Sequence, residues 1–489
     1  MKRLDERVKE KISSDIKEDV KYIKEIFKDA SDIVIREFHF QKLNAALIYV
    51  DGMADKILLD DYVLESLMQE GDPIKSVYDV KDKILTVSDI KEVEKLSEGI
   101  KAMLSGDTLM LIDSLEAAYV IGTRLWPARG VGEPSSETVV RGAREGFTET
   151  VRFNTALIRR RIRDSRLKMA GKSIGVRSKT DVIVTYIEDI VNTDVLDELY
   201  DRLDKIDIDA ILDSGYIEQM IEDNKLSPFP QVQSTERPDV VAAALYEGRI
   251  AVLVDNSPFA IIVPATLPNL FQSPDDYYQR WLNASITRVI RTFALILSVM
   301  LPALYVAITS FHTAIIPTRL AYSIAASREG VPFPAFIEAL IMEISLALLL
   351  EAIVRLPRPI GATIGIVGGL IIGQSAVSAG IVSPIMIIII GATAITEFIS
   401  PNYGVTVGLR LIRFLLLIAS AIAGLYGIML GLLVVLTHLI RLKSFGIPYL
   451  APAVNPNVND FKDLFIRLPF KYFKKRPSYM NTKDKVRQK

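Results

Sequence analysis

Hydrophobic and polar residues are distributed very differently in the two halves of the chain. In residues 1–285, short apolar runs rich in β-branched residues alternate with stretches that have the apolar spacing of helices. This alternation predicts an α/β soluble region. From residue 286 onward, long apolar runs predominate, and a run of about 20 such residues can cross a membrane as a helix. The second half is therefore predicted to be an α-helical polytopic membrane domain.

Four apolar segments reach the length of a membrane span: 292–311, 335–354, 381–399 and 414–440. The run 361–380 is shorter and prolines flank it, which favours a broken or re-entrant helix that is buried in protein or lines a cavity. Basic residues precede the first span and follow the last, so both chain ends are predicted on the cytoplasmic side and the number of crossings is even. We count four crossings, and six if 315–334 and 361–380 also cross.

The strand and helix pattern of the soluble half occurs twice. Early in each unit an apolar strand is followed by a helix, and later a helix that ends in glycine precedes a hairpin, with Asp113 and Asp255 at matching turns. The pattern predicts a duplicated α/β unit with two related subdomains, roughly 35–130 and 172–265. The alternative is chance similarity, because hairpins often follow helices.

The predicted organisation has five segments: an α/β subdomain (1–131), a helical connector (132–170), a second α/β subdomain with a membrane-surface elbow helix (171–285), the transmembrane domain with four full spans plus re-entrant segments (286–440), and a basic cytoplasmic tail (441–489). The elbow carries Tyr277, Tyr278 and Trp281, and aromatic side chains of this kind settle at the lipid headgroup level. The alternative is that these aromatics belong to the soluble core.

Charge separates the same regions, although the whole chain has a net charge of only −1. Residues 1–285 carry −13, residues 286–440 carry +3 and the tail carries +9. A basic run at 159–168 lies within the acidic half, so we interpret it as a helix whose arginines pair with neighbouring acids, rather than as a nucleic-acid site.

The sequence contains no pattern typical of a catalytic or cofactor site. There is no cysteine, and the three histidines lack the spacing of a metal site. Neither a Walker loop nor a dinucleotide-binding glycine motif is present. We therefore expect no enzyme activity, no cofactor and no metal.

Acidic residues inside the apolar segments are the most unusual feature of the second half: Glu338, Glu343, Glu351 and Glu397. A carboxylate is costly in hydrocarbon, so each should face the bundle interior, a partner or water. Arg355 and Arg358 could neutralise Glu351. The other three are candidates for the charge that would make an ion path select cations.

Glycines recur every four residues in the interrupted segment, at Gly361, Gly365, Gly369 and Gly373. Such a stripe lets a second helix approach closely, which is the packing interpretation. Alternatively, the stripe and the polar residues beside it line a narrow passage in an oligomer. For that case the predicted pore-lining residues are Ile366, Gly369, Ile372, Gly373, Gln374 and Val377.

Several long motifs resemble the spore germinant receptor A-subunit family, the GerA type. The connector contains "EPSSETVVRGAREGFTET" and "NTALIRRRIRD", and the membrane half contains "RLPRPIGATIGIVGG" and "SFGIPYLAP". The resemblance covers about residues 30–455. Its connector motif comprises Pro134, Ser135, Ser136, Glu137, Arg141, Gly142, Arg144, Glu145, Gly146 and Phe147.

The resemblance implies a multi-pass protein of the spore inner membrane. Such an A subunit acts in nutrient-triggered germination with a transporter-like B subunit and a lipoprotein C subunit, and forms a homo-oligomeric ring around an ion path. The implied function is a ligand-gated cation channel that contacts membrane lipid. The alternatives are a sporulation-stage paralogue that serves as an accessory ion channel, a secondary transporter, or a membrane signalling scaffold.

Overall fold

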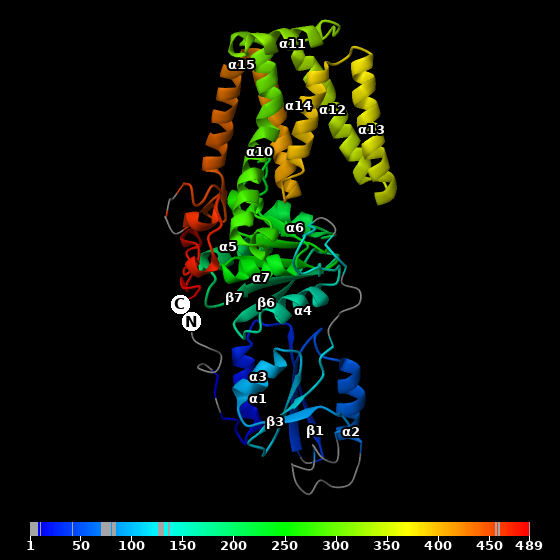
Figure 1. Cartoon of the computed structure of the whole chain (residues 1–489). Helices are drawn as coiled ribbons and strands as arrows, with labels where there is room; N and C mark the ends of the chain where they lie inside the picture. The colour runs from blue at the N-terminus through cyan, green and yellow to red at the C-terminus, as the bar shows by residue number, and fades with distance from the viewer. Residues whose placement is uncertain are drawn as a thin grey trace.

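The computed structural model describes residues 8–9, 11–41, 43–69, 80, 85–125, 132–134, 137–454, 457 and 460–488, except for the side chains of 354, 358, 359, 362, 364, 366, 367 and 370. Figure 1 shows an elongated molecule with three tiers. One α/β subdomain forms an end, a second α/β subdomain lies in the middle, and a helical bundle forms the other end. This is the predicted fold class.

Each soluble subdomain contains a five-stranded sheet, and the two sheets have equivalent strand orders: β1-β2-β4-β5-β3 and β6-β7-β9-β10-β8. Every strand pair within them is antiparallel. The strands of the first sheet are β1 (Ile33–Phe40), β2 (Leu43–Val50), β3 (Ile90–Val93), β4 (Thr108–Ile112) and β5 (Ala118–Ile121). Those of the second are β6 (Leu167–Ile174), β7 (Thr180–Ile187), β8 (Gln233–Thr235), β9 (Ile250–Val254) and β10 (Ala260–Val263).

Helices cover both faces of each sheet. The first subdomain has α1 (Ile16–Ile26), the π-helix η2 (Leu58–Leu64), α2 (Glu65–Met68) and α3 (Leu96–Met103). The second has α4 (Val151–Arg161), α5 (Thr193–Asp204), α6 (Ser214–Ile221) and α7 (Pro238–Tyr246). Because successive strand residues point to opposite faces, Leu109 packs with α1 and α3 while Met110 packs with η2 and α2. Likewise, Leu253 packs with α4 and α7 while Val252 packs with α5 and α6.

The duplication extends to individual hydrogen bonds. An oxygen of Asp113 accepts from the N–H of Ile16, the first residue of α1, at 3.5 Å, and an oxygen of Asp255 accepts from the N–H of Val151, the first residue of α4, at 3.0 Å. The next residue at each turn is left-handed, with φ of 67° at Ser114 and 68° at Asn256. The predicted matching turns are confirmed, and each repeat begins with a helix that the sequence pattern did not include.

The described part of the connector is mostly irregular up to residue 150, and α4 begins at Val151. The predicted helical connector is therefore helical only from Val151, and its motif residues Ser135 and Ser136 lie outside the described residues. The expected ion pairs of the basic run are present. Arg159 is completely buried and makes two hydrogen bonds, of 2.7 and 2.8 Å, to Asp32 of the first subdomain.

The elbow packs into the soluble part. It consists of α8 (Leu267–Phe271) and the four-residue α9 (Asp275–Tyr278). The Tyr277 hydroxyl donates to Asp463 at 2.7 Å, and the Tyr278 hydroxyl donates to Asp239. Tyr278 thus has its hydroxyl partner in the second subdomain, which favours the soluble-core alternative for this residue, whereas the partner of Tyr277 lies in the tail. Trp281, which begins the next helix, is exposed.

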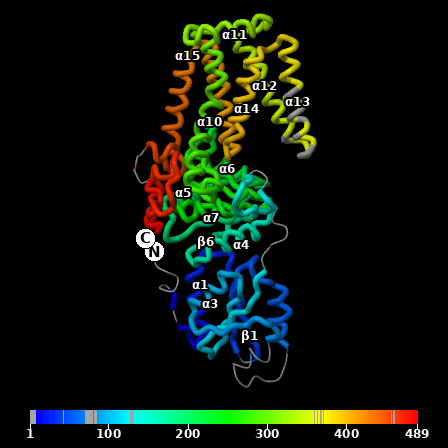
Figure 2. The backbone as a smooth tube through the Cα atoms, in the orientation of Figure 1, coloured from blue at the N-terminus to red at the C-terminus, as the bar shows by residue number. Residues whose placement is uncertain are grey.

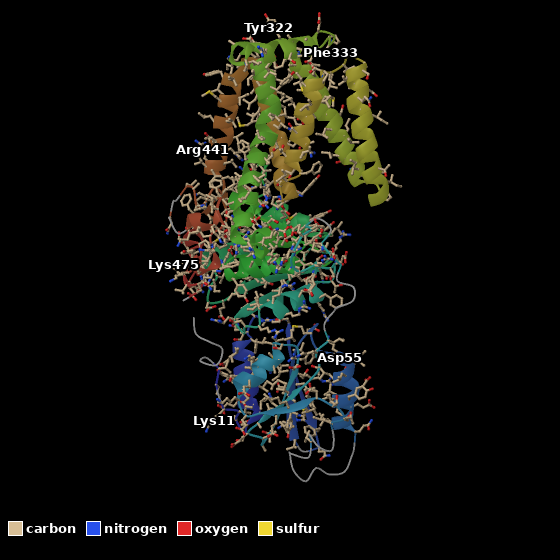
Figure 3. The ribbon with its side chains drawn as sticks, viewed as in Figure 1. Lys11, Asp55, Tyr322, Phe333, Arg441 and Lys475 are labelled. Carbon is tan, nitrogen blue, oxygen red and sulfur yellow. The ribbon has the colours of Figure 1, made fainter. Side chains whose placement is uncertain are left out.

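The bundle is formed by α10 (Trp281–Ser310), α11 (Thr318–Arg328), α12 (Ala335–Val354), α13 (Arg358–Ser378), α14 (Pro384–Glu397) and α15 (Tyr403–Arg441), with the short 3₁₀ helix η4 (Thr313–Ile315) before α11. By length and composition, α10 and α15 qualify as candidate membrane spans. Helix α11 lies across the far end of the bundle (Figure 1), where Tyr322 and Phe333 are labelled in Figure 3.

Helix α15 is two helices that fold back on each other. Ala423 and Gly424 have non-helical backbone angles, and Gly424 has a φ of 59°. Beyond this turn, a Cβ on Gly427 would lie 2.0 Å from the Ala419 carbonyl oxygen, and one on Gly431 would lie 2.6 Å from the Leu416 side chain. These contacts define an antiparallel hairpin with arms 403–422 and 425–441. The predicted single span 414–440 is therefore wrong.

The interrupted segment, in contrast, is one uninterrupted helix. Helix α13 has 21 residues, Pro357 is its N-cap residue, and the next proline lies in its first turn. Pro384 begins α14 in the same way. Proline is tolerated in the first helical turn because those N–H groups have no intrahelical acceptor. The prediction of a broken helix at 361–380 is wrong, since its prolines start helices.

Six helical segments run along the bundle, namely α10, α12, α13, α14 and the two arms of α15 (Figure 2). The chain enters the bundle and leaves it at the end beside the second subdomain, where Arg441 is labelled in Figure 3. An even number of passages was expected. The structure has six passages. The two beyond the four predicted spans are α13 and the second arm of the α15 hairpin, and residues 315–334 do not supply one.

The tail is folded onto the second subdomain and the base of α10. It contains a two-stranded sheet of β11 (Lys443–Ser444) and β12 (Ile447–Pro448) and the 3₁₀ turns η5 (Asp460–Asp463), η6 (Phe470–Tyr472) and η7 (Ser478–Met480). Arg476 is buried and donates to the Tyr246 carbonyl at 2.8 Å. The Arg467 N–H donates to Ser285 of α10 at 3.2 Å. Figure 3 shows Lys475 beside the middle tier.

Candidate functional site

A buried charge cluster joins three elements of the bundle. Arg413, on the first arm of α15, lies 3.0 Å from Glu343 of α12 and 2.8 Å from Glu397 of α14, and all three side chains are at most 4% exposed. Arg410, one turn earlier, also binds Glu397, at 3.0 Å from its Nε. Two carboxylates thus face two guanidinium groups. The cluster carries no net charge, which is the arrangement that makes buried ions tolerable.

A second pair lies at the far end of the bundle. Glu338 of α12 is fully buried, accepts from Arg328 of α11 at 3.0 Å, and accepts from the Ser383 N–H at 2.9 Å. Ser383 is the N-cap residue of α14, so Glu338 places a negative charge at a helix N-terminus, where it is favourable. Glu338 therefore connects α11, α12 and α14.

The fourth acid behaves differently. Glu351 and Arg355 form an exposed pair, with Nε 3.0 Å from the carboxylate. The expected pairing with Arg355 is confirmed, while the side chain of Arg358 lies outside the described residues. All four acids have arginine partners. This pairing favours a structural role for the three buried acids over that of an unpaired charge in an ion path.

The glycine stripe of α13 has two surroundings. A Cβ on Gly361 would lie 3.1 Å from the carbonyl oxygen of Ile353 in α12, and one on Gly365 would lie 3.1 Å from the Ile353 side chain. One on Gly373 would lie 3.6 Å from Ile387 of α14, whereas one on Gly369 would meet none of the described atoms within 4 Å. Close helix packing therefore explains Gly361 and Gly365 but not Gly369.

The predicted pore-lining residues also divide into two groups. Gln374 is exposed and Ile372 is 38% exposed. Val377 instead packs in the cluster shared by α10, α12 and α14, and the side chain of Ile366 lies outside the described residues. Gly369 and Ile372, three residues apart, share a face of α13 that is open to the described residues of the single chain, and Gln374 is exposed on another side of the helix.

The connector motif joins the soluble elements beneath the bundle. Glu137 accepts from the Thr235 hydroxyl at 2.6 Å, and the pKa of Glu137 is raised to about 7 by burial. Arg237, at the start of α7, donates to the carbonyls of Glu137 and Ala143 at 3.2 and 2.7 Å. The buried Phe147 ring packs beside α4 and α7.

The other motif residues make local contacts. Glu145 accepts from Arg161 at 2.7 Å and from Arg160, and these arginines hold its pKa below the usual value despite desolvation by burial. The Arg141 N–H donates to Asp275 of α9 at 3.3 Å. The other four described motif residues make three further contacts. Buried Pro134 lies beside Gly146, the exposed Arg144 pairs with Glu133 at 3.3 Å, and a Cβ on Gly142 would lie 2.6 Å from the Tyr278 ring. The motif therefore connects α4, α7 and the elbow.

Sequence reasoning missed the arginine partners of the three buried acids. Arg410 and Arg413 are three residues apart in an apolar run, which places them on one helix face. Two arginines on one face of an apolar helix could have indicated a buried acidic partner such as Glu397. Nothing in the local sequence identified Arg237 or the tail as structural elements.

Comparison with known proteins gives a consistent result. The family model described as "Bacillus/Clostridium GerA spore germination protein" matches residues 21–479. The chain is 42% identical to spore germination protein GerLA of Bacillus cereus over 95% of each chain. It is 40% identical to spore germination protein B1 of Bacillus subtilis (strain 168), over 98% of this chain and 100% of that protein. The crystal structure of the N-terminal domain of the A subunit of the Bacillus megaterium spore germinant receptor GerK3 is 35% identical, covering 53% of this chain and 98% of that one, with a TM-score of 0.43.

Proposed function

The chain belongs to the GerA family of spore germination proteins, which are A subunits of germinant receptors, and from this premise we propose that it forms a nutrient-gated cation channel in the spore inner membrane. In this proposal several copies form a ring around the ion path, with the open face of α13 toward the axis. A transporter-like B subunit and a lipoprotein C subunit complete the receptor, and lipid surrounds the bundle. The proposal includes no catalytic step.

The observation that carries the channel proposal is the open face of α13. This face combines Gly369, where an added Cβ would meet none of the described atoms within 4 Å, with the apolar Ile372, and the amide of Gln374 is exposed on another side of the same helix. Apolar constrictions can gate an ion path by excluding water, and polar groups can line it. A helix that packs on one side and is bare on the other suits a position between its own bundle and a pore.

The proposed preference for cations rests on the charge of the soluble tiers and not on the intramembrane acids. Because Glu338, Glu343 and Glu397 are paired with arginines, they add little net charge to a passage. Residues 1–285 carry −13, and the +9 tail that folds onto the second subdomain reduces the net charge of the soluble tiers to −4. A negative field at the mouth of a channel raises the local cation concentration, so we assign a weak cation preference to this remaining negative charge.

Reconstitution into planar bilayers tests the function directly. Discrete unitary currents opened by nutrient support a channel, slow saturable flux indicates a carrier, and the absence of flux from the assembled receptor indicates a scaffold. We expect Gly369→Leu to block current and Ile372→Ala to leak without nutrient, while Ile388→Ala, on an exposed face of α14, serves as the control. Fully assembled Gly369→Leu receptor with normal currents would contradict the assignment of α13.

The proposed topology can be tested separately, because the chain has no cysteine of its own. Single cysteines placed at Ser13 and Ser478 should react with an impermeant reagent only from the cytoplasmic side. Reaction of either position from the opposite side would refute an even number of crossings with both ends inside.

A further inference from the structure

A cavity of about 450 Å³ lies where the second subdomain meets the bundle. Its wall contains Glu137 of the connector motif, residues of α7, the elbow, the loop 398–402 between α14 and α15, and Phe470 and Arg487 of the tail. Ligand pockets in proteins commonly have volumes of roughly 300–1,000 Å³ and occur between domains. The cavity is therefore large enough for a small molecule, and its wall includes both soluble and bundle elements.

Two guanidinium groups of the wall have spare donors. Arg249 is 3% exposed, donates to the Pro264 carbonyl and to Gln233 at 2.8 Å each, and has an Nη2 that bonds to no described residue. Of the described residues with such an unsatisfied atom, only Arg249 lines the cavity. Among the described residues, Arg487 has a loose contact of 3.6 Å with Glu247 and lies over the Phe473 ring. A buried donor without a partner costs free energy, which an acceptor group on a ligand would recover.

Two carboxylates of the same wall have spare acceptors. One oxygen of Glu137 accepts from Thr235, and the described residues donate no hydrogen bond to the other. Glu247 has the Arg487 contact and no closer partner among them. The remaining charged groups of the wall are satisfied, because Asp239 binds Arg237 and Tyr278, and Arg291 binds Asp276 at 2.9 Å.

We propose that this junction cavity binds a small ampholyte, a molecule with one anionic acceptor group and one cationic donor group joined by an apolar segment. Arg249 would bind the anionic group and Glu137 the cationic group, while Arg487 and Glu247 lie 3.6 Å from each other. The wall also includes apolar side chains such as Leu270, Ile399 and Phe470. A simple anion would leave the second oxygen of Glu137 without a donor, and a simple cation would leave the Nη2 of Arg249 without an acceptor.

The position of the cavity gives the ligand a route to the bundle. Ser400 and Asn402 belong to its wall, and the Asn402 side chain accepts from the Val405 N–H at 3.2 Å as the N-cap of α15. The same arm of α15 carries Arg410 and Arg413. A bound ampholyte would therefore contact the loop that fixes the start of the helix on which the buried charge cluster depends.

Binding of matched probes to the full chain in detergent tests the ligand class. The probes are 6-aminohexanoate, hexanoate, which lacks the amine, and hexylamine, which lacks the carboxylate. Isothermal titration should show one site per chain, with 6-aminohexanoate bound at least about tenfold more tightly than either relative, a difference of about 1.4 kcal/mol. Equal binding of the three probes, or no saturable binding of 6-aminohexanoate, would overturn the proposal.

Variants locate the site. Arg249→Met should weaken 6-aminohexanoate binding at least tenfold, while Arg177→Met, whose side chain is 82% exposed and outside the cavity, should not. Because Arg249 also supports the fold, Ala243→Phe gives an independent test: Ala243 lines the cavity from the exposed side of α7, so the larger ring fills space without removing a charge. Undiminished binding by folded Ala243→Phe protein would place the ligand elsewhere and overturn the assignment.

Chemical protection provides a readout at the loop. A cysteine at Ser400 should react with a maleimide more slowly when 6-aminohexanoate is present, whereas a cysteine at the exposed Ser323 of α11 should react at an unchanged rate. Equal rates at Ser400 with and without bound ligand would exclude the loop from the site. These measurements need no ion current. The ampholyte proposal can therefore fail while the channel proposal holds, and the channel proposal can fail while the ampholyte proposal holds.

Discussion

The two soluble subdomains have equivalent strand orders but different neighbours. In the first, a Cβ on Gly106 would meet the flexible Arg124 side chain at 3.4 Å, whereas in the second a Cβ on the equivalent Gly248 would meet Thr482 of the tail at 2.3 Å. Only the second subdomain is held between the tail and the bundle (Figure 1). The comparison indicates that duplication supplied two similar units, and that contacts at the ends of their helices gave them different roles.

The largest loss of stability is expected at the joint between the two soluble subdomains, which is the buried Arg159–Asp32 pair. Arg159→Met would leave Asp32 buried without its partner, which costs about 3–5 kcal/mol. Hydrogen exchange of the intact protein should then show lost protection in both β1 and α4. Arg152→Met is the control, because that side chain is 70% exposed and 3.5 Å from Asp51, and should change stability by less than about 1 kcal/mol. Similar protection in both variants would mean that the joint does not depend on the buried pair.

The next largest effect is expected where the elbow and the tail attach to α10. Asp463 accepts from Arg288 at 2.8 Å and from Tyr277 at 2.7 Å. Asp463→Asn removes the charge from these bonds and should cost about 1.5–3 kcal/mol. The rate of amide hydrogen exchange should rise in the elbow and the tail but not in the first subdomain. Asp209→Asn, at an exposed side chain, should leave both unchanged, and a uniform rise throughout the molecule would contradict a local attachment.

The paired glycines give the most direct test of the difference between the repeats. Both have positive φ, 100° at Gly106 and 89° at Gly248, so alanine is strained at each by about 1–3 kcal/mol. Gly248→Ala should lower the unfolding temperature more than Gly106→Ala, because only its methyl group collides with the tail. Equal shifts of the unfolding temperature would show that the tail moves aside at no cost in stability. The Thr482 contact would then not distinguish the two subdomains.

The soluble repeat was predictable because its information is local. Alternating apolar strands, helix-ending glycines and the turn aspartates Asp113 and Asp255 are sequence features, and each constrains the nearby backbone. Helix α12 was also predicted with its observed bounds, since Pro334 and Arg355 flank an unbroken apolar run.

What the sequence could not provide were contacts between distant segments. The apolar run 414–440 gave no composition change at Ala423, where the chain reverses, because both arms of the hairpin are apolar. The tail was described only as basic, and its buried Arg467 and Arg476 became visible once the fold placed them beside α10 and α7. The pairing of Glu397 with Arg410 and Arg413 likewise depends on how α14 meets α15.

The last expected effect is a pH dependence confined to the second subdomain. Burial raises the pKa of Glu137 from its usual 4.5 to about 7, so between these values the folded protein holds a proton that the unfolded chain has released. Stability from this group is therefore present at low pH and is lost as pH rises toward 7. Glu137→Gln stays neutral at every pH, so its unfolding temperature relative to wild type should increase from pH 5 to pH 8. Glu133→Gln, at the exposed pair with Arg144, should follow wild type throughout. A constant difference between Glu137→Gln and wild type across this range would mean that Glu137 titrates like an exposed carboxylate, and that the wall of the junction cavity is open to water.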